Sequence, residues 1–168
     1  MIRKSTVFLG IGSNLNKKKN ILSCLNIFKS SFKYCFISPI YQSPSFGFKG
    51  HDFHNLVIKI KTHFDLISLK KWLMYIEDIH GRDRSQKRYS NRTLDIDILL
   101  FNNDVYQDGN ITIPRPEILT HGYILKPLID ISIKMKHPQT LNTFEHHWDK
   151  LQNQQTSKLK LVNYKYHS

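Results

Sequence analysis

The chain has 168 residues, and its 25 Lys and Arg against 13 Asp and Glu give a formal net charge of +12, which favours a polyanionic partner such as nucleic acid, an anionic membrane or a polyphosphate ligand. The length suits one domain, since a compact fold of this size buries roughly 70% of the surface of its unfolded chain. Seven glycines, six prolines and two cysteines exclude a collagen-like chain, a low-complexity chain and a disulfide framework.

The first third of the sequence predicts a strand, a helix and a second strand. The apolar run 6–12 leads into Gly, Ser and Asn, which is typical of a buried strand that ends in a turn. From Ile21 to Phe32, apolar residues recur at three- and four-residue steps, as on one face of a helix. Residues 34–41 predict the second strand, and the Pro- and Gly-containing segment 43–53 predicts a long loop.

The middle third repeats this order. Residues 54–62 alternate between apolar and polar, which predicts a half-buried strand. Helical spacing continues to Ile79, with Ser68 as the expected N-cap and Gly81 just past the C-terminus. The polar stretch 82–92 then leads into the apolar run 93–101. We find no repeat or linker, so residues 1–168 predict a single domain, with about 149–168 as a basic C-terminal tail or an edge strand.

The N-terminal sequence and the cysteines predict a cytoplasmic protein. The first apolar run is interrupted by Gly10 and is too short for a signal peptide or a membrane span. Cys24 and Cys35 belong to no Cys-x-x-Cys pair, which is typical of free thiols in a reducing compartment.

Asp95 and Asp97 stand two residues apart in an otherwise apolar run. On a strand this spacing sends both carboxylates to one face, with Cα atoms about 6.5 to 7 Å apart. Burying two like charges is unfavourable without a cation. Mg²⁺ is one candidate, because it typically binds one or two carboxylates together with substrate phosphates. The alternative is that the two carboxylates cap a sheet edge and form ion pairs with nearby arginines.

The stretch just before these carboxylates is strongly basic, with five cations within eleven positions: Arg82, Arg84, Lys87, Arg88 and Arg92. A charged run is often only a solvated loop, but this one would bring guanidinium groups to the strand that carries the acids. Arginine binds phosphate oxygens in a bidentate manner. An acidic pair beside an arginine loop favours a nucleoside triphosphate as ligand, although the sequence contains no P-loop motif.

These motifs resemble a known family. The run Arg92-Thr93-Leu94-Asp95-Ile96-Asp97-Ile98, preceded at ten residues by Arg82, is similar to the signature of the 6-hydroxymethyl-7,8-dihydropterin pyrophosphokinases of folate synthesis. Further stretches agree in order and spacing: 10–15, 41–44 with 53–55, and 113–114 with 123–128. The resemblance extends over about residues 7–131.

The resemblance implies transfer of a pyrophosphoryl group from ATP to the hydroxymethyl group of the pterin, with release of AMP. It implies an α+β fold with a ferredoxin-like βαββαβ core, a mostly antiparallel sheet and helices on both faces in three layers. Two Mg²⁺ ions would be held by Asp95 and Asp97, and the catalytic positions are Arg82, Arg92, Asp95 and Asp97. The matching ATP-binding positions are Glu77, Arg82, Arg84, Arg88, Tyr89, Arg92, Ile98, Thr112 and Arg115. The matching pterin-binding positions are Ser43, Pro44, Phe46, Phe53, Asn55 and Tyr123.

Several positions depart from the family pattern. Arg115 stands where the family usually has an imidazole, and His121 stands where it usually has an arginine. Arg115 can still reach phosphate, whereas His121 lacks a permanent charge, so its role stays open. Tyr89 replaces a more usual tryptophan, and Ser43 and Phe46 are further local variants. None of these departures affects the two aspartates.

Two other functions fit parts of the sequence. A basic RNA-binding module would share the strand-helix-strand doublet, and residues 45–53 faintly resemble its aromatic signature. A nucleotidyltransferase would use Gly12-Ser13 before the acids, but the 82-residue gap to Asp95 is far too long. We therefore expect small-molecule substrates, no nucleic-acid or membrane partner and a monomer, and we leave open a contact with dihydropteroate synthase.

Overall fold

The computed structural model describes residues 4–153 and 158–164. Its elements in chain order are β1 (Ser5–Ser13), α1 (Lys17–Ser31), β2 (Cys35–Ile37), β3 (Ile40–Ser43), β4 (Phe53–Thr62), α2 (Leu66–Ile79), β5 (Asp95–Phe101), β6 (Tyr106–Asp108), β7 (Ile111–Ile113), the 3₁₀ helix η1 (Pro116–Leu119), α3 (Gly122–Ser132), α4 (Phe144–Asn153) and β8 (Lys160–Val162).

The main sheet has the order β5-β1-β4-β3-β8, and β2 also pairs with β4. All of its pairings are antiparallel. With β2 and β3 taken as one interrupted strand, the chain order through β5 is βαββαβ, as in the expected ferredoxin-like core. The longest strands, β1 and β4, lie at the centre and form the platform of the fold.

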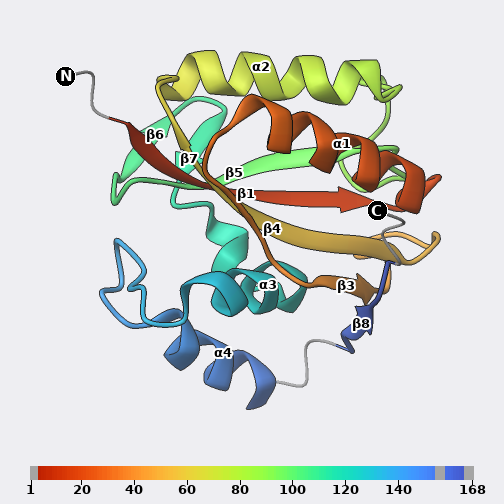
Figure 1. Cartoon of the computed structure of the whole chain (residues 1–168). Coiled ribbons are helices and arrows are strands. Elements are labelled where there is room, and N and C mark those ends of the chain that lie inside the picture. Colours follow the sequence, from red (N-terminus) through yellow and green to blue (C-terminus); the bar gives the residue numbers. More distant parts are fainter. Residues whose placement is uncertain (1–3, 154–157, 165–168) are drawn as a thin grey trace.

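Helices cover both faces of this sheet, in the expected three layers (Figure 1). Alternate residues of the strands point to opposite faces, so each face has its own core. On one face α1 and α2 pack on β1 and β4, and Trp72 of α2 contacts Phe28 of α1 and Phe32 just after α1 edge-on, at centroid distances of 5.2 and 5.3 Å. On the other face α3 and α4 bury a second cluster that includes Leu125 and Phe144.

The structure corrects two local expectations and adds one element that was not predicted. The predicted strand over 34–41 is two short strands, β2 and β3, with a break at Ser38 and Pro39. Pro39 has no N–H to donate to the ladder, which explains a break there. The N-cap of α2 is Asp65 rather than Ser68, and its side chain accepts a 2.7 Å hydrogen bond from the Ser68 N–H. A small hairpin, β6–β7, follows β5 and had no clear sequence signal.

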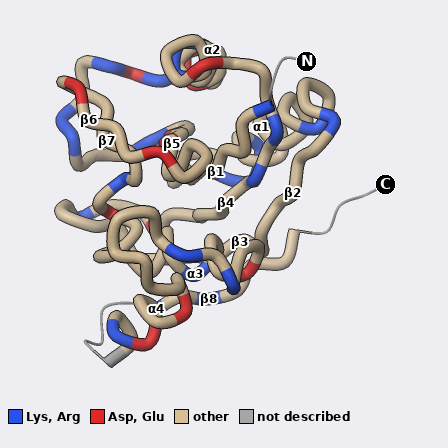
Figure 2. Tube along the Cα trace, turned by 90° about the vertical axis from the view of Figure 1, so that its left-hand side faces the viewer, with Lys and Arg blue, Asp and Glu red and all other residues tan. Residues whose placement is uncertain are grey.

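Of the tail or edge strand expected over about 149–168, a short edge strand is present as β8, which pairs with β3, whereas residues 149–153 belong to helix α4. Residues 154–157 and 165–168 of the predicted tail lie outside the described residues. Among the helices that the structure describes, none is both long and apolar enough to cross a membrane. Figure 2 shows basic residues along α1 and the surrounding loops, with acidic residues on α2 and β5.

Candidate active site

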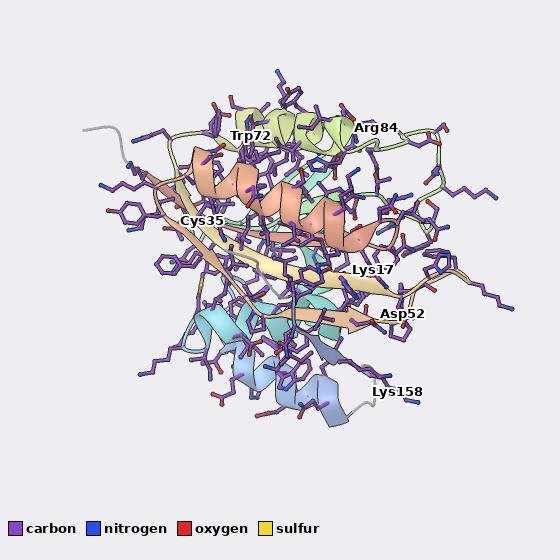
Figure 3. All side chains as sticks on the ribbon, turned by 45° about the vertical axis from the view of Figure 1, so that its right-hand side comes forward. Lys17, Cys35, Asp52, Trp72, Arg84 and Lys158 are labelled. Atoms are coloured by element: carbon purple, nitrogen blue, oxygen red, sulfur yellow. The ribbon has the colours of Figure 1, made fainter. Side chains whose placement is uncertain are left out.

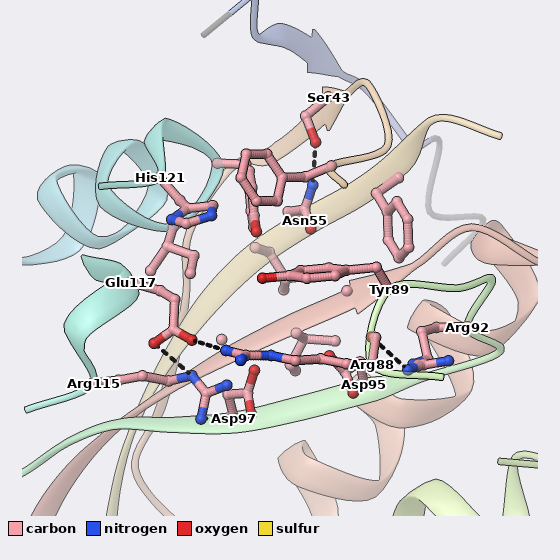
Figure 4. A pocket seen from close by; sticks show the side chains of 18 of the residues that line it. Ser43, Asn55, Arg88, Tyr89, Arg92, Asp95, Asp97, Arg115, Glu117 and His121 are labelled. Carbon is pink, nitrogen blue, oxygen red and sulfur yellow. Dashed lines mark hydrogen bonds and ion pairs between the residues drawn. The ribbon is translucent and has the colours of Figure 1, made fainter. Parts of the chain in front are cut away.

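A cleft of about 400 Å³ opens on the sheet face that also packs against α3. Its floor comes from β1, β4 and β5, and its walls come from the loops 44–52 and 82–94, from η1 and from the start of α3. Most of the predicted site residues line it: Ser43, Pro44, Phe46, Phe53, Asn55, Arg82, Arg88, Tyr89, Arg92, Asp95, Asp97, Arg115, His121 and Tyr123. Figure 4 shows the cleft from close by, with Asn55 on one side and Asp95, Asp97 and Arg115 on the other. Tertiary folding therefore gathers four separate stretches of sequence into one cavity.

Two glycines of β1 keep the floor of the cleft open. Gly12 is paired with Asn55 on one side and with Asp95 on the other, and Gly10 lies in the same way between Val57 and Asp97. A Cβ atom at Gly12 would lie 3.1 Å from the Asn55 Oδ1, and one at Gly10 would lie 3.3 Å from a Leu99 methyl group. The missing side chains leave a continuous path from the two carboxylates to Asn55.

The two aspartates lie on one face of β5, as their spacing predicted, and both line the cleft. Each forms an ion pair with an arginine from another segment. An Asp95 oxygen lies 3.2 Å from a nitrogen of Arg82, and an Asp97 oxygen lies 3.3 Å from a nitrogen of Arg115. The arginine pairing considered as an alternative is thus part of this site.

Arg82 still has hydrogen-bonding capacity after this contact. Its Nε and Nη1 atoms are buried and have no hydrogen-bond partner among the described residues. A buried donor without an acceptor is costly, and a guanidinium group binds phosphate oxygens well. The unpaired edge of Arg82 therefore fits an anionic group in the cleft, next to Asp95.

The carboxylates also fit a divalent cation. Burial in the cleft, followed by repulsion from Asp95, raises the pKa of Asp97 to about 7, while Arg115 opposes the shift. This shift indicates that the arginines do not fully compensate the negative charge at this position. No group of three or more His, Cys, Asp or Glu side chains in the described part of the chain has metal-ligand geometry. Two carboxylates alone suit Mg²⁺, which takes its remaining oxygens from water and phosphate.

Arg92 is bound differently from Arg82. Its side chain is buried, and its guanidinium group donates to the backbone carbonyl oxygens of Lys87 and Arg88 at 2.7 and 2.8 Å. It also donates to Gln86 Oε1 at 3.2 Å and to the Ser90 hydroxyl. In this structure Arg92 thus holds the loop 82–94 in shape.

Glu117, which sequence reasoning missed, connects that loop to η1. Its two oxygens lie 3.2 Å from a nitrogen of Arg88 and 3.5 Å from the Nε of Arg115 (Figure 4). One carboxylate thereby orients two arginines that come from different segments. No motif marked Glu117, because its partner Arg88 lies 29 positions away. Gln86, Ser90, Phe48 and Leu99 also line the cleft and were not predicted.

On the opposite side of the cleft, Asn55 has a fixed orientation. Its Nδ2 donates a 2.9 Å hydrogen bond to the Ser43 hydroxyl, and its side chain is buried. Because the amide nitrogen faces Ser43, the Oδ1 faces Gly12 and the floor of the cleft. Asn55 can therefore accept a hydrogen bond from a ligand there.

Aromatic rings close the wall beside Asn55. Phe53 and Tyr123 line the cleft, as predicted, and each is supported by a neighbouring ring, Phe48 at 6.3 Å and His121 at 5.2 Å between centroids. His121 also contacts Phe46 at a centroid distance of 4.5 Å. Burial lowers the pKa of His121, and its ring packs against Phe46 and Tyr123 in this wall.

Four predicted positions lie outside the cleft lining. Glu77 is buried below it and accepts a 2.8 Å hydrogen bond from the Ile96 N–H, while Arg84 pairs with Glu77 and Asp78 on the surface. Ile98 points into the core under α1 and α2. Thr112 lies on β7 of the small hairpin. Glu77 and Arg84 thus support β5 and the end of α2 from outside the cavity.

The chain matches known proteins over most of its length. Residues 8–133 match the model of the family described as 7,8-dihydro-6-hydroxymethylpterin-pyrophosphokinase. A 2-amino-4-hydroxy-6-hydroxymethyldihydropteridine pyrophosphokinase from Helicobacter pylori is 38% identical over 127 residues, which cover 73% of this chain and 78% of that protein. The enzyme of the same name from Haemophilus influenzae is 31% identical, with 80% and 86% covered.

Among solved structures, the fold is similar to a Plasmodium falciparum HPPK-DHPS protein with a TM-score of 0.68. The sequence identity is 16%, and the match covers 88% of this chain but 42% of that longer one, so this likeness concerns the fold alone. The family model and the bacterial relatives decide the assignment. This chain belongs to the 7,8-dihydro-6-hydroxymethylpterin pyrophosphokinase family.

Proposed function

We propose that the cleft carries out the reaction of its family, the transfer of a pyrophosphoryl group from ATP to 6-hydroxymethyl-7,8-dihydropterin, which gives the pterin pyrophosphate and AMP in folate synthesis. Membership of the family makes the chain a transferase that uses ATP as co-substrate. One observation carries the assignment of the reaction to this cleft. The open glycine floor joins a carboxylate-arginine cluster to an amide-and-aromatic wall.

The carboxylate-arginine cluster is the proposed ATP side. The buried free donors of Arg82 would bind the triphosphate, and Arg88 and Arg115 would exchange Glu117 for phosphate oxygens. Tyr89 lies over this end of the cleft, and the guanidinium carbon of Arg88 lies 5.4 Å from the centre of its ring. Glu77, Arg84, Ile98 and Thr112 would act through the elements around the nucleotide, since their side chains lie outside the cavity.

Asp95 and Asp97 are the proposed ligands of two Mg²⁺ ions that arrive with ATP. When bound, such ions neutralise the charge of the triphosphate and polarise its phosphoryl groups. Metal binding would require both carboxylates to loosen their contacts with Arg82 and Arg115, which would free those guanidinium groups for the phosphates. The same arginines would then balance charge before and after the nucleotide binds.

The amide-and-aromatic wall is the proposed pterin side. Phe53 and Tyr123 would stack against the flat heterocycle, and Asn55 would accept a hydrogen bond from its edge. Ser43 orients Asn55, while Pro44 and Phe46 complete the wall. The hydroxymethyl group would then extend along Gly12 towards Asp95.

We propose in-line attack of the pterin hydroxyl oxygen on the β-phosphorus of ATP. The new bond joins this oxygen to the β-phosphorus, the hydroxyl proton is released to solvent, and the bond from the β-phosphorus to the α,β-bridging oxygen breaks as AMP leaves with that electron pair. The transition state of phosphoryl transfer is loose, so positioning and charge neutralisation supply most of the acceleration. Arg82, next to Asp95, would stabilise the charge that develops on the departing AMP. The loops 44–52 and 82–94 would exclude water from the reaction.

We further propose that the protein is a cytoplasmic monomer in which residues 1–168 form one domain. Its ligands would be small molecules. The RNA-binding alternative has lost its support, because residues 45–52 form a loop rather than a strand, and two aspartates lie on the face where RNA would bind.

An assay of AMP release tests the function directly. Purified protein with MgATP and the hydroxymethyl dihydropterin should release AMP only when the pterin is present, and EDTA should stop the release. Asp97→Asn keeps the shape of the side chain but removes its charge, and it should reduce turnover by at least about 100-fold while the circular dichroism spectrum is unchanged. Asp149→Asn on the exposed side of α4 is the matched control and should retain full activity. Turnover that persists in EDTA, or in Asp97→Asn, would contradict the metal role.

A further inference from the structure

The C-terminal segment reaches the proposed pterin wall from the opposite face of the sheet. β8 pairs with β3 through Ile40, Tyr41 and Gln42, so the short strand β3 is held between β4 and β8. Just past β8, Tyr164 crosses over β3 and contacts His54 of β4, with 2.6 Å between the Tyr164 hydroxyl and the His54 Nδ1. This contact joins residues 110 positions apart, and Tyr164 lies beyond residues 8–133 that match the family.

A chain of hydrogen bonds connects this contact to β3 and to Asp52. The Asp52 carboxylate can only accept, so the Gln42 Nε2 donates to it at 2.8 Å. The Gln42 Oε1 must then accept from the His54 Nε2 at 3.2 Å. In a neutral His54 the Nδ1 is then the acceptor, and the Tyr164 hydroxyl donates to it.

The surroundings support a neutral His54. The side chain is 8% exposed, and burial, followed by the positive charge of Lys17, lowers its pKa, which Asp52 only partly opposes. Lys17 also donates to the backbone carbonyl of Asp52 at 2.9 Å, and the two residues lie near the same end of the sheet in Figure 3. The Nζ of Lys18 lies 5.9 Å from the ring centre of Tyr164. The chain of contacts thus runs from the C-terminal segment to the end of the loop 44–52.

His54 lies in β4 between two residues of the pterin wall, Phe53 and Asn55. Its side chain points to the α1 face, whereas theirs point into the cleft. Holding His54 by both ring nitrogens therefore fixes the strand directly behind the wall. Gln42 does the same for β3, where the next residue, Ser43, orients the amide of Asn55 at 2.9 Å.

We propose that Tyr164 is a positioning residue for pterin binding. Through His54 and Gln42 it holds the ends of β3 and β4 in the arrangement that places Phe53, Asn55 and Ser43 in the cleft. Because these contacts reach the pterin wall and not the carboxylate-arginine cluster, Tyr164 acts on the affinity for the pterin and not on the affinity for ATP.

Tyr164→Phe tests this proposal, because it removes the hydroxyl and keeps the ring. One hydrogen bond of ordinary strength corresponds to a change in affinity of about three- to tenfold. We expect the KM for the pterin, and its dissociation constant measured by titration without ATP, to rise by that factor. The turnover number and the KM for ATP should stay within about twofold. Tyr75→Phe, on the exposed side of α2, is the matched control and should behave like the wild type.

A second variant separates the proposed coupling from a general loss of stability. His54→Ala removes the partner, so adding Tyr164→Phe to it should produce no further rise in the pterin KM. Equal changes in both KM values, or a pterin KM within twofold of wild type in Tyr164→Phe, would overturn the proposal.

The kinetic part of this test rests on the proposed function, so a third measurement is independent of activity. Amide hydrogen exchange in Tyr164→Phe should become faster in β3 and at the start of β4 but should stay unchanged in β5. Unchanged exchange in β3 would overturn the positioning role. A wild-type protein that releases no AMP would overturn the proposed function alone.

Discussion

At the level of single residues, the cleft depends as much on two missing side chains as on the charged ones. Gly10 and Gly12 lie between the aspartates of β5 and the residues of β4 that face them. A strand interior normally disfavours glycine, because it adds conformational entropy and packs nothing. At these two positions the absence of a Cβ atom leaves the floor of the cleft open.

The effect of a substitution at Gly12 on pterin binding should therefore grow with the size of the introduced side chain. Gly12→Ala places a methyl group 3.1 Å from the Asn55 Oδ1, and Gly12→Val fills the floor between Asn55 and Asp95. We expect the KM for the pterin to rise modestly in the first variant and by at least about tenfold in the second, since an overpacked contact costs about 1–3 kcal/mol. Steady-state kinetics would measure this, and an unchanged KM in Gly12→Val would show that the substrate does not cross this floor.

Arg82 should matter more for turnover than for binding. Its free donors are buried beside Asp95, and a donor aimed at charge that develops in the transition state is worth about 10²–10³ in rate. We expect Arg82→Ala to lower the turnover number by that factor, while the KM for ATP changes by less than about threefold. Steady-state kinetics with varied ATP would measure both constants. A change confined to the KM for ATP would mean that Arg82 only binds the ground state.

At the level of elements, the short strand β3 carries part of the cleft wall. β3 has four residues, yet it is anchored on both faces. On the α3 face the Tyr41 hydroxyl donates to Asp130 at 2.6 Å, and on the other face Gln42 contacts His54 and Asp52. Helix α2, in contrast, lies outside the cleft and supports β5 through Glu77.

The N-cap of α2 offers a test of stability that is separate from function. The Asp65 side chain accepts hydrogen bonds from the Ser68 N–H at 2.7 Å and from its hydroxyl at 3.0 Å. Removing a cap leaves a helix N–H unpaired. We expect Asp65→Ala to lower the melting temperature by about 2–4 °C, with kinetic constants equal to those of the wild type. Calorimetry would measure the first quantity. A loss of activity without a loss of stability would indicate that α2 has a direct part in catalysis.

At the level of the whole molecule, the charge of +12 attracts anionic ligands, but the cleft itself contains both signs. Arg82, Arg88 and Arg115 each contact a carboxylate within the cleft. Long-range attraction of anionic ligands therefore follows from the net charge of the chain. Selection of a ligand within the cleft would instead need arginines that can exchange a carboxylate for a phosphate.

The lowered pKa of His54 predicts how the stability of the whole fold changes with pH. Its pKa is lowered from 6.5 to about 4, so between these values the unfolded chain binds a proton that the folded protein does not. The free energy of unfolding should therefore fall as pH drops from 6.5 to 4, by up to about 3 kcal/mol from this group. Asp97, with its raised pKa, acts in the opposite direction in the same range. The free energy of unfolding of the wild type and of His54→Gln should therefore be measured by urea unfolding at several pH values and compared. If the free energy of unfolding changes with pH equally in both proteins, this role of His54 is contradicted.

Much of the site could be predicted because it rests on local pattern. The period-two spacing of Asp95 and Asp97 fixes a shared face whatever packs around the strand. The Arg92-Thr93-Leu94-Asp95-Ile96-Asp97 run also carried the family resemblance, and with it the reaction. Ser68 was the wrong N-cap because Asp65, three residues earlier, has an equally suitable side chain, and only the geometry of the chain before α2 selects between them.

The sequence by itself determined the order of the main strands and helices up to β5, the placement of the acidic pair and the family. The tertiary structure alone decided which arginine meets which carboxylate, that Glu117 joins Arg88 to Arg115, and that Tyr164 reaches His54. The physical reason is one of range. Alternation and helical periodicity follow from backbone geometry over a few residues, whereas these contacts join segments up to 110 positions apart, and their partners are fixed only when the packed sheet sets the direction of each side chain.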